Sequence, residues 1–255
     1  QQGSLDFSLV GQSQLNLFIK PILAFDLPYI VDASKNRQFL EAFDPYGGVL
    51  YKYVDGEAQK VGLKLVMTLD TPFRSYAFTP RSEVENLGSV RGVKVRVTMS
   101  PLERAFANAL AMNPTAVGWT EVYTALQQGT VDGEIINYGT FAAANHAEIA
   151  DRFLLTRHNM AKIFVFMNKA RFDALTPEQQ KMIIDAGRAA QMEEWDFSQE
   201  YELRGEEYCK QHNVKFIELT DAERAEIMKA IQPLYDEYSK EIDPAFLKLI
   251  QDVQK

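Results

Sequence analysis

The fold is decided by Trp119-Thr-Glu-Val-Tyr-Thr-Ala-Leu-Gln-Gln-Gly-Thr-Val-Asp-Gly133 and by Gly92-Val-Lys-Val-Arg-Val97, which lies upstream of it. The longer stretch indicates a short helix that Gly129 ends, followed by a tight turn into a strand. In the shorter stretch valines alternate with Lys94 and Arg96, which is the two-residue period of a strand. Helices and strands in alternation are the units of an α/β fold.

Arg96 stands at the exit of a strand whose other face is apolar, where an arginine is costly to bury without an anionic partner. The next helix begins at Ser100-Pro101, and helix N-termini attract anions. In open α/β sheets, ligands lie beyond the carboxyl ends of the strands. A guanidinium can hold both oxygens of a carboxylate. We therefore expect Arg96 to bind an anion; the alternative is a surface arginine in a loose ion pair.

The composition is that of an ordinary globular protein, with 46% hydrophobic and 24% charged residues among 255. The net charge of -8 argues against nucleic acid and anionic membranes as partners, because both require clustered Lys and Arg. No apolar run reaches the roughly 18 residues of a membrane span, so we expect no direct membrane insertion. The chain opens at Gln1 rather than Met, which favours a processed product.

The sequence contains no metal or catalytic motif. Cys209 is the single cysteine, which excludes a disulfide framework and a thiolate cluster. His146, His158 and His212 lack metal-ligand spacing, and there is no nucleophile elbow, P-loop or dinucleotide fingerprint. We therefore expect no metal, no cofactor and no enzyme activity.

Apolar strand-like runs alternate with helical patterns, which predicts an α/β architecture with mainly parallel sheets. Capping boxes mark helix starts at Ser100, Thr176 and Thr220. From Thr176 to about His212 the pattern is helical without proline, and such a helix would extend roughly 50 Å at 1.5 Å per residue. A helix of this length predicts two lobes that it spans. The strand-like runs are Leu5–Val10, Leu63–Leu69, Val93–Thr98, Ala116–Gly118, Gly133–Ile136 and Ile163–Met167.

The two opening stretches carry a family resemblance. The helix motif Glu121-Val-Tyr-x-Ala-Leu-Gln-x-Gly-x-Val-Asp-Gly133 and the strand motif Gly92-x-Lys-x-Arg-Val97 resemble the DctP-like solute-binding proteins of tripartite ATP-independent periplasmic (TRAP) transporters. The resemblance runs in order from Gln2-Gly-Ser-Leu-Asp-Phe7 to the C-terminus. In the family, a strand–helix–strand–helix segment of about 60 residues precedes that motif, so we expect this chain to lack those N-terminal units.

The resemblance implies a two-lobed periplasmic-binding-protein fold of the α/β class, with discontinuous lobes and a long helix spanning both. It predicts that the chain passes between the lobes near Thr71, near Ala161 and along the long helix. Lobe I then comprises residues 1–71 and 161–198, and lobe II comprises residues 72–160 and 199–255.

The resemblance also implies a ligand site between the lobes. Arg96 matches the arginine that holds the carboxylate of the solute. Arg74 matches a second arginine that contacts the solute, the alternative being an ion pair with a local carboxylate. Trp119 matches an aromatic wall of the cleft, the alternative being simple core filling. Gln12 matches a polar loop residue that faces the ligand, the alternative being an ordinary loop glutamine.

One departure from the family pattern affects this site. Ile136 stands where many relatives place a solute-binding asparagine, so that contact is either lost or shifted to Asn137 or Tyr138. Lys162 matches a polar ligand contact and would suit a second acidic group on the solute, unless it pairs on the surface. The expected ligand-binding residues are Arg96, Arg74, Trp119, Gln12, Asn137, Tyr138 and Lys162.

The resemblance implies an extracytoplasmic, periplasmic receptor that binds a small organic acid and delivers it to the membrane permease subunits of a TRAP transporter. Two alternatives stay open at this point. One is an α/β acyl-transfer or lyase enzyme that acts on a small carboxylate, and the other is a sensory ligand-binding domain. Recovery of unchanged ligand after incubation with carboxylates would distinguish a receptor from an enzyme.

Overall fold

The computed structural model describes residues 4–255, and within this range seven strands form one mixed sheet. They are β1 (Phe7–Gly11), β2 (Leu63–Phe78), β3 (Lys94–Val97), β4 (Asn113–Ala116), β5 (Gly133–Ile136), β6 (Arg152–Asn168) and β7 (Lys215–Ile217). Their order is β1-β6-β2-β5-β3-β4, and β7 pairs with β6. The sequence motif that starts at Gln2 begins outside the described residues.

The sheet combines two kinds of pairing. β6 is antiparallel to β1 and β2, and β2 is antiparallel to β5. β3 is parallel to β4 and β5, and β6 is parallel to β7. The expectation of mainly parallel sheets is therefore wrong. The sheet departs from that expectation because two long antiparallel strands, β2 and β6, form its centre.

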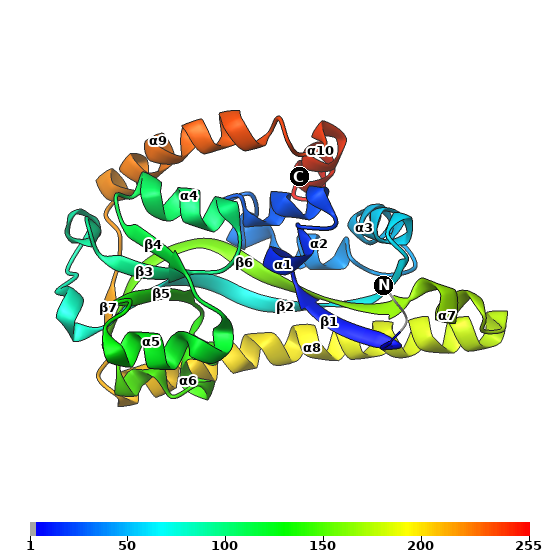
Figure 1. Ribbon diagram of the computed structural model, residues 1–255, viewed down its shortest axis with the longest axis horizontal. Helices are drawn as coiled ribbons and strands as arrows, with labels where there is room; N and C mark the ends of the chain where they lie inside the picture. Colours follow the sequence, from blue (N-terminus) through cyan, green and yellow to red (C-terminus); the bar gives the residue numbers. More distant parts are fainter. Residues whose placement is uncertain (1–3) are drawn as a thin grey trace.

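Helices lie on both sides of this sheet (Figure 1). At one end of the molecule β3, β4 and β5 lie with α4, α5 and α6, while α1, α2, α3 and α7 lie at the other end with β1. None of the described helices is both long and apolar enough to cross a bilayer. The α-helices of the described range are α1 (Gln12–Leu15), α2 (Asn36–Glu41), α3 (Val49–Lys60), α4 (Pro101–Ala109), α5 (Val122–Gln128), α6 (Tyr138–Ala143), α7 (Lys169–Asp173), α8 (Pro177–Gln211), α9 (Asp221–Tyr238) and α10 (Pro244–Asp252).

β2 and β6 run through the middle of the molecule and connect its two ends (Figure 1). Their pairing shifts register between Asp70 and Phe73 and again just after Arg74, and such bulges bend a strand pair. Between them the Thr71 hydroxyl donates to the Ala161 carbonyl and accepts from the Ala161 N–H, each at 2.9 Å. The two positions predicted as lobe crossings are thus joined directly; the exact division into lobes stays a prediction.

α8 confirms the predicted long helix, with 35 residues and a capping box between Thr176 and Gln179. It passes beneath the whole sheet in Figure 1. The two glycines of α8, Gly187 and Gly205, each lie against a neighbouring element without room for a side chain. A Cβ at Gly187 would lie 2.7 Å from Val66 Cγ1, and a Cβ at Gly205 would lie 2.3 Å from the Tyr138 carbonyl carbon. α8 therefore packs on β2 at Gly187 and on the start of α6 at Gly205, at positions that only glycine fits.

The three predicted helix caps differ in how completely they form. The box at Thr220 is complete, like that at Thr176. At Ser100 only half of the box forms: the serine hydroxyl accepts from the Glu103 N–H, but the Glu103 carboxylate turns to Thr98 instead. This diverted carboxylate belongs to a buried polar cluster.

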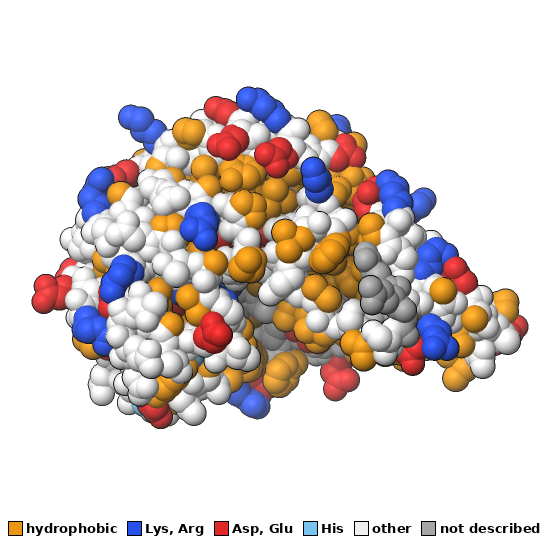
Figure 2. Space-filling model, in the orientation of Figure 1, with side chains coloured by type: hydrophobic (Ala, Val, Ile, Leu, Met, Phe, Trp, Pro, Cys, Tyr) orange, Lys and Arg blue, Asp and Glu red, His pale blue; other side chains and the backbone are white. Residues whose placement is uncertain are grey.

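β1 forms an edge of the sheet and carries exposed apolar side chains. Figure 2 shows hydrophobic side chains gathered across the middle of this broad face. An apolar strand at a sheet edge favours association with another segment. The large exposed side chains of this part of the chain are Leu5, Phe7, Leu9, Leu17 and Phe18.

Candidate functional site

Arg96 lies in β3 between β4 and β5 and is only 6% exposed. Its Nε donates to the Val117 carbonyl at 3.0 Å. Within residues 4–255 no carboxylate forms an ion pair with this guanidinium, although the charges of Glu103 and Glu134 act on it from nearby. Burial lowers the pKa of Arg96, and these two carboxylates oppose that effect. A buried cation without an ion pair is suited to receive an anion.

Arg74, in β2, already has an anionic partner. Its Nη2 lies 2.7 Å from Glu103 Oε1, and its Nε donates to Asn159 Oδ1 at 3.2 Å. The other Glu103 oxygen accepts from the Thr98 N–H at 2.9 Å and from the Thr98 hydroxyl at 2.6 Å. Burial raises the pKa of Glu103, but Arg74 and Thr98 outweigh it and hold that pKa below its ordinary value. Arg74 therefore forms the local ion pair that was the alternative to a free ligand-binding arginine.

Gln12 and Asp26 continue this cluster on the other side. Asp26 ends the 3-10 helix η1 (Lys20–Asp26) and is 1% exposed. The Gln12 side-chain amide donates to Asp26 Oδ1 at 2.6 Å, and its oxygen accepts from the Lys162 backbone N–H at 2.7 Å. Burial, and then the charge of Glu103, raises the pKa of Asp26 to about 6. Gln12 thus orients a buried carboxylate.

Comparison with known proteins assigns the chain. Bacterial extracellular solute-binding proteins, family 7 (DctP), match it over residues 1–241. The chain belongs to this family. It is 26% identical to a solute-binding protein of Verminephrobacter eiseniae, over 100% of this chain and 73% of that protein.

Solved structures agree with this solute-binding fold. A TRAP periplasmic solute-binding protein from Xanthobacter autotrophicus, with bound beta-D-galacturonate, has a TM-score of 0.87 at 26% identity, covering 99% of this chain and 80% of that one. A second from Pseudomonas putida, with bound D-glucuronate, has a TM-score of 0.86 at 25% identity, covering 98% and 78%. The two-lobed fold is confirmed. Family and neighbours are transport proteins rather than enzymes, which removes the acyl-transfer or lyase alternative.

Lys162 of this solute-binding protein lies in the hydrophobic core. It is 1% exposed, its ammonium pairs with Asp70, and the rings of Phe43 and Phe39 lie 4.3 Å and 5.3 Å from it. Burial lowers the pKa of Lys162, and Asp70 opposes that effect. The alternative of a surface pair is wrong. The ammonium has its own anionic partner, so its surroundings do not support selection of a second acidic group on the solute.

Trp119 connects to Arg96 through His146, considered from the sequence only as a metal ligand, and through Glu134. It begins the 3-10 helix η5 (Trp119–Glu121), is 47% exposed, and its ring lies 5.7 Å from that of His146. His146 Nδ1 lies 2.5 Å from Glu134 Oε1, and Glu134 is the register partner of Arg96 in the parallel pair β3–β5. Register partners project from the same face of a sheet. Trp119 is thus the exposed member of a series of neighbouring side chains that leads through His146 and Glu134 to Arg96.

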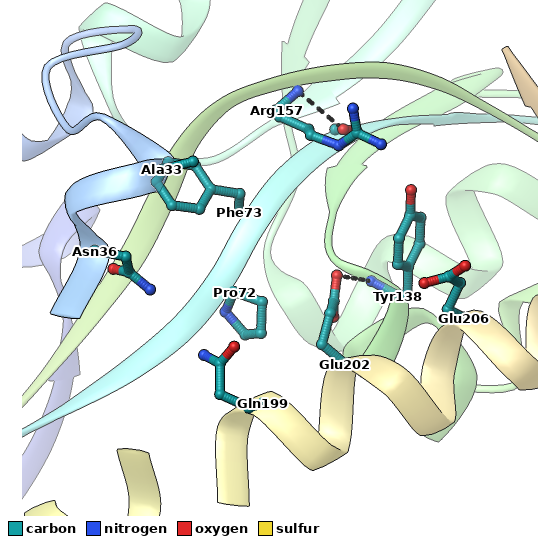
Figure 3. Close-up of a pocket in the computed structure, with 10 residues that line it drawn as sticks. Ala33, Asn36, Pro72, Phe73, Tyr138, Arg157, Gln199, Glu202 and Glu206 are labelled. Atoms are coloured by element: carbon teal, nitrogen blue, oxygen red, sulfur yellow. Dashed lines mark hydrogen bonds between the residues drawn. The ribbon is translucent and has the colours of Figure 1, made fainter. Parts of the chain in front are cut away.

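Asn137 and Tyr138 lie where α6 begins. The Asn137 side chain accepts from the Thr140 N–H at 2.8 Å and so caps the helix. The N–H of Tyr138 donates to Glu202 of α8, and burial raises the pKa of that glutamate to about 7. Tyr138 lines a cavity of about 300 Å³ between α8 and the central strands, shown in Figure 3. The described lining comprises Ala33, Asn36, Pro72, Phe73, Ser75, Tyr138, Arg157, Gln199, Glu202 and Glu206.

The structure therefore divides the expected residues into groups. Arg74 and Gln12 belong to the polar cluster whose Glu103 also acts on Arg96, and Trp119 reaches Arg96 through His146. Lys162 lies in the core, and Tyr138 faces α8. Sequence reasoning missed Asp26, Glu103, Glu134 and His146. Only Glu103 carried a signal, as the third residue of a capping box.

Proposed function

We propose that this solute-binding protein holds a small organic acid by its carboxylate at Arg96 and delivers it to the membrane permease subunits of a TRAP transporter in the periplasm. One observation carries the proposal: Arg96 is buried, yet no carboxylate among the described residues neutralises it. The galacturonate and glucuronate in the two neighbouring structures support the same ligand chemistry.

The other buried cations near the centre of the molecule limit the class of solute that the site could bind. Glu103 neutralises Arg74, and Asp70 neutralises Lys162. Arg96 is the one of these three cations that has no ion pair among the described residues. We therefore propose a monocarboxylate whose remaining polar groups are neutral hydroxyls, as in a sugar acid. A second carboxylate would enter a region that already holds Glu103, Asp26 and Glu134, and like charges in a buried site are unfavourable.

The contact itself follows from guanidinium geometry. Nε of Arg96 is committed to the Val117 carbonyl, so the two terminal Nη groups are the donors for the solute. Two parallel N–H···O bonds to one carboxylate supply both charge and orientation. Closure of the lobes would exclude water and strengthen this pair, because the attraction between charges grows as the local dielectric falls. Trp119, half exposed, would cover the apolar face of the solute.

Isothermal calorimetry tests the proposal with matched sugars. D-Glucuronate and D-galacturonate should bind, whereas D-glucose and D-galactose, which lack the carboxylate, should bind at least about thirtyfold more weakly. The matching dicarboxylates, D-glucarate and galactarate, should also bind more weakly than the monocarboxylates. Mass spectrometry should recover each bound acid unchanged. Equal affinity for a uronate and its parent sugar would overturn the proposal.

A further inference from the structure

Asp26 is a buried carboxylate with no ion pair among the described residues. Its Oδ1 accepts from Gln12 at 2.6 Å, its Oδ2 has a long contact of 3.5 Å with the Asn16 amide, and it hydrogen-bonds the Ser100 side chain. The orientation of Gln12 is fixed, since its oxygen is held by the Lys162 backbone N–H. Gln12 can therefore only donate to Asp26. An ionised carboxylate here lacks the counter-charge that burial normally demands.

Two carboxylates share one guanidinium at this point. Arg74 makes its ion pair with Glu103, at 2.7 Å, and acts on Asp26 only through longer-range attraction. Glu103 in turn repels Asp26 and attracts Arg96. Asp26 and Arg96 therefore each interact electrostatically with the same two residues, Arg74 and Glu103. A charge placed on Arg96 changes the balance of charge that Asp26 experiences.

The elements packed around Asp26 supply few other charges. β2 contributes Arg74, and α4 with its cap contributes Glu103 and the Ser100 hydroxyl. α1 contributes the amide of Gln12, and the following Asn16 adds its own. β6 contributes the Met160 carbonyl, which shares the Gln12 amide at 3.4 Å, while the Lys162 ammonium of that strand is paired with Asp70. The Ser100 hydroxyl can both donate and accept, so it can bond either protonation state of Asp26.

We propose that the solute and a proton bind to this protein together, with the proton held at Asp26. The inference rests on the proposed function, because it needs the negative charge of the solute to sit at Arg96. On the division of lobes expected from the sequence, Asp26 belongs to lobe I, whereas Arg74, Ser100 and Glu103 belong to lobe II. Closure would then bring the carboxylates together, and the proton removes their repulsion.

The ionisation of Asp26 gives the direction and the pH window. Burial, then Glu103, raises the pKa of Asp26 to about 6, against the hydrogen bonds of Ser100 and Gln12 and the attraction of Arg74. A carboxylate bound at Arg96 adds negative charge and raises this pKa further. Binding therefore takes up a proton in the pH range just above 6. Below about pH 5 the proton is already present, so uptake disappears.

Calorimetric titration of D-glucuronate in buffers of different ionisation enthalpy measures this uptake directly. The solute is fully ionised throughout the range, so protons must come to the protein. At pH 6.5 to 7 the slope of heat against buffer enthalpy should report a positive fraction of one proton. The affinity should fall by about two- to fivefold between pH 6 and pH 8, which is the effect of raising a pKa of about 6 by about half a unit to one unit.

Asp26→Asn should bind D-glucuronate with no proton uptake and with an affinity that is flat from pH 6 to 8. Glu194→Gln is the matched control. Burial also raises the pKa of Glu194, to about 7. Its carboxylate accepts a hydrogen bond from the Asp70 N–H and does not contact Asp26 in the hydrogen bonds of the described residues. Glu194→Gln should therefore keep the proton uptake of the parent.

Three results would count against the inference. Binding by the parent without any buffer-dependent heat overturns the proton site alone, and so does undiminished uptake by Asp26→Asn. If neither D-glucuronate nor D-galacturonate binds at any pH, the proposed function falls, and the coupled proton falls with it.

Discussion

Arg96 at the end of β3 and Lys162 within β6 are both buried cations, yet their surroundings differ in one decisive respect. Lys162 pairs with Asp70 and lies over the rings of Phe43 and Phe39. Arg96 has a carbonyl partner, Val117, and no ion pair among residues 4–255. The first cation completes a core, and the second is the one that we propose binds the solute carboxylate. Burial of a charge alone is therefore weak evidence for a binding site, and the proposal for Arg96 rests on burial without an ion pair.

The largest effect expected from this comparison is on stability. Lys162→Met should lower the free energy of unfolding by about 3–5 kcal/mol, because it leaves Asp70 buried without its partner. The affinity for the solute should change by less than about threefold, equivalent to under 1 kcal/mol. Urea denaturation and calorimetry measure the two quantities. The double variant with Asp70→Asn should recover most of the lost stability, and failure to recover it would show that the ion pair is not the cause.

Asp26 is a buried carboxylate that, like Arg96, has no ion pair among the described residues. Its folded-state pKa of about 6 exceeds the ordinary value of 3.8, so the folded protein binds a proton that the unfolded chain has released. The parent's stability relative to Asp26→Asn is therefore greatest below pH 4 and is lost as the pH rises through 6. Over this window the difference should change by about 3 kcal/mol, at about 1.4 kcal/mol per pKa unit. Denaturation of the parent and of Asp26→Asn at pH 4 and at pH 7 measures this difference. The same stability difference between the two proteins at both pH values would contradict the expectation.

The smallest expected effect concerns Trp119, the half-exposed side chain of the series that leads to Arg96. Trp119→Ala should weaken solute binding by about 0.5–1.5 kcal/mol, the usual contribution of an aromatic contact, without a comparable loss of stability. Trp195 is the other tryptophan and is 5% exposed. A ligand-induced change in fluorescence should therefore disappear in Trp119→Phe and persist in Trp195→Phe. The reverse result would place the solute away from Trp119.

The comparison also explains how far sequence reasoning reaches. α8 and the caps at Thr176 and Thr220 were predictable, because their signals lie within a few neighbouring residues. β2 extends to Phe78 rather than Leu69, since Thr71-Pro72 is a local turn signal that pairing with β6 overrides.

The site was predictable only in part. Arg96 could be placed from its strand and the family motif, whereas whether a cation is already neutralised depends on residues brought close by tertiary packing. Arg74 and Glu103 are 29 positions apart, and Lys162 and Asp70 are 92 apart. Pairs at such separations leave no local pattern, and a single sequence cannot tell a free cation from a paired one.

We propose above that Arg96 supplies the charge that holds the solute. Calorimetric titration of the best-binding sugar acid against Arg96→Ala, with Lys162→Met as the matched buried-cation control, tests it most directly. We expect Arg96→Ala to lose about 2–5 kcal/mol of binding free energy, at least about thirtyfold in affinity, with stability little changed. Arg96→Lys should also lose most of the affinity, because an ammonium cannot make the paired contact. An Arg96→Ala affinity within about tenfold of the parent would contradict the account.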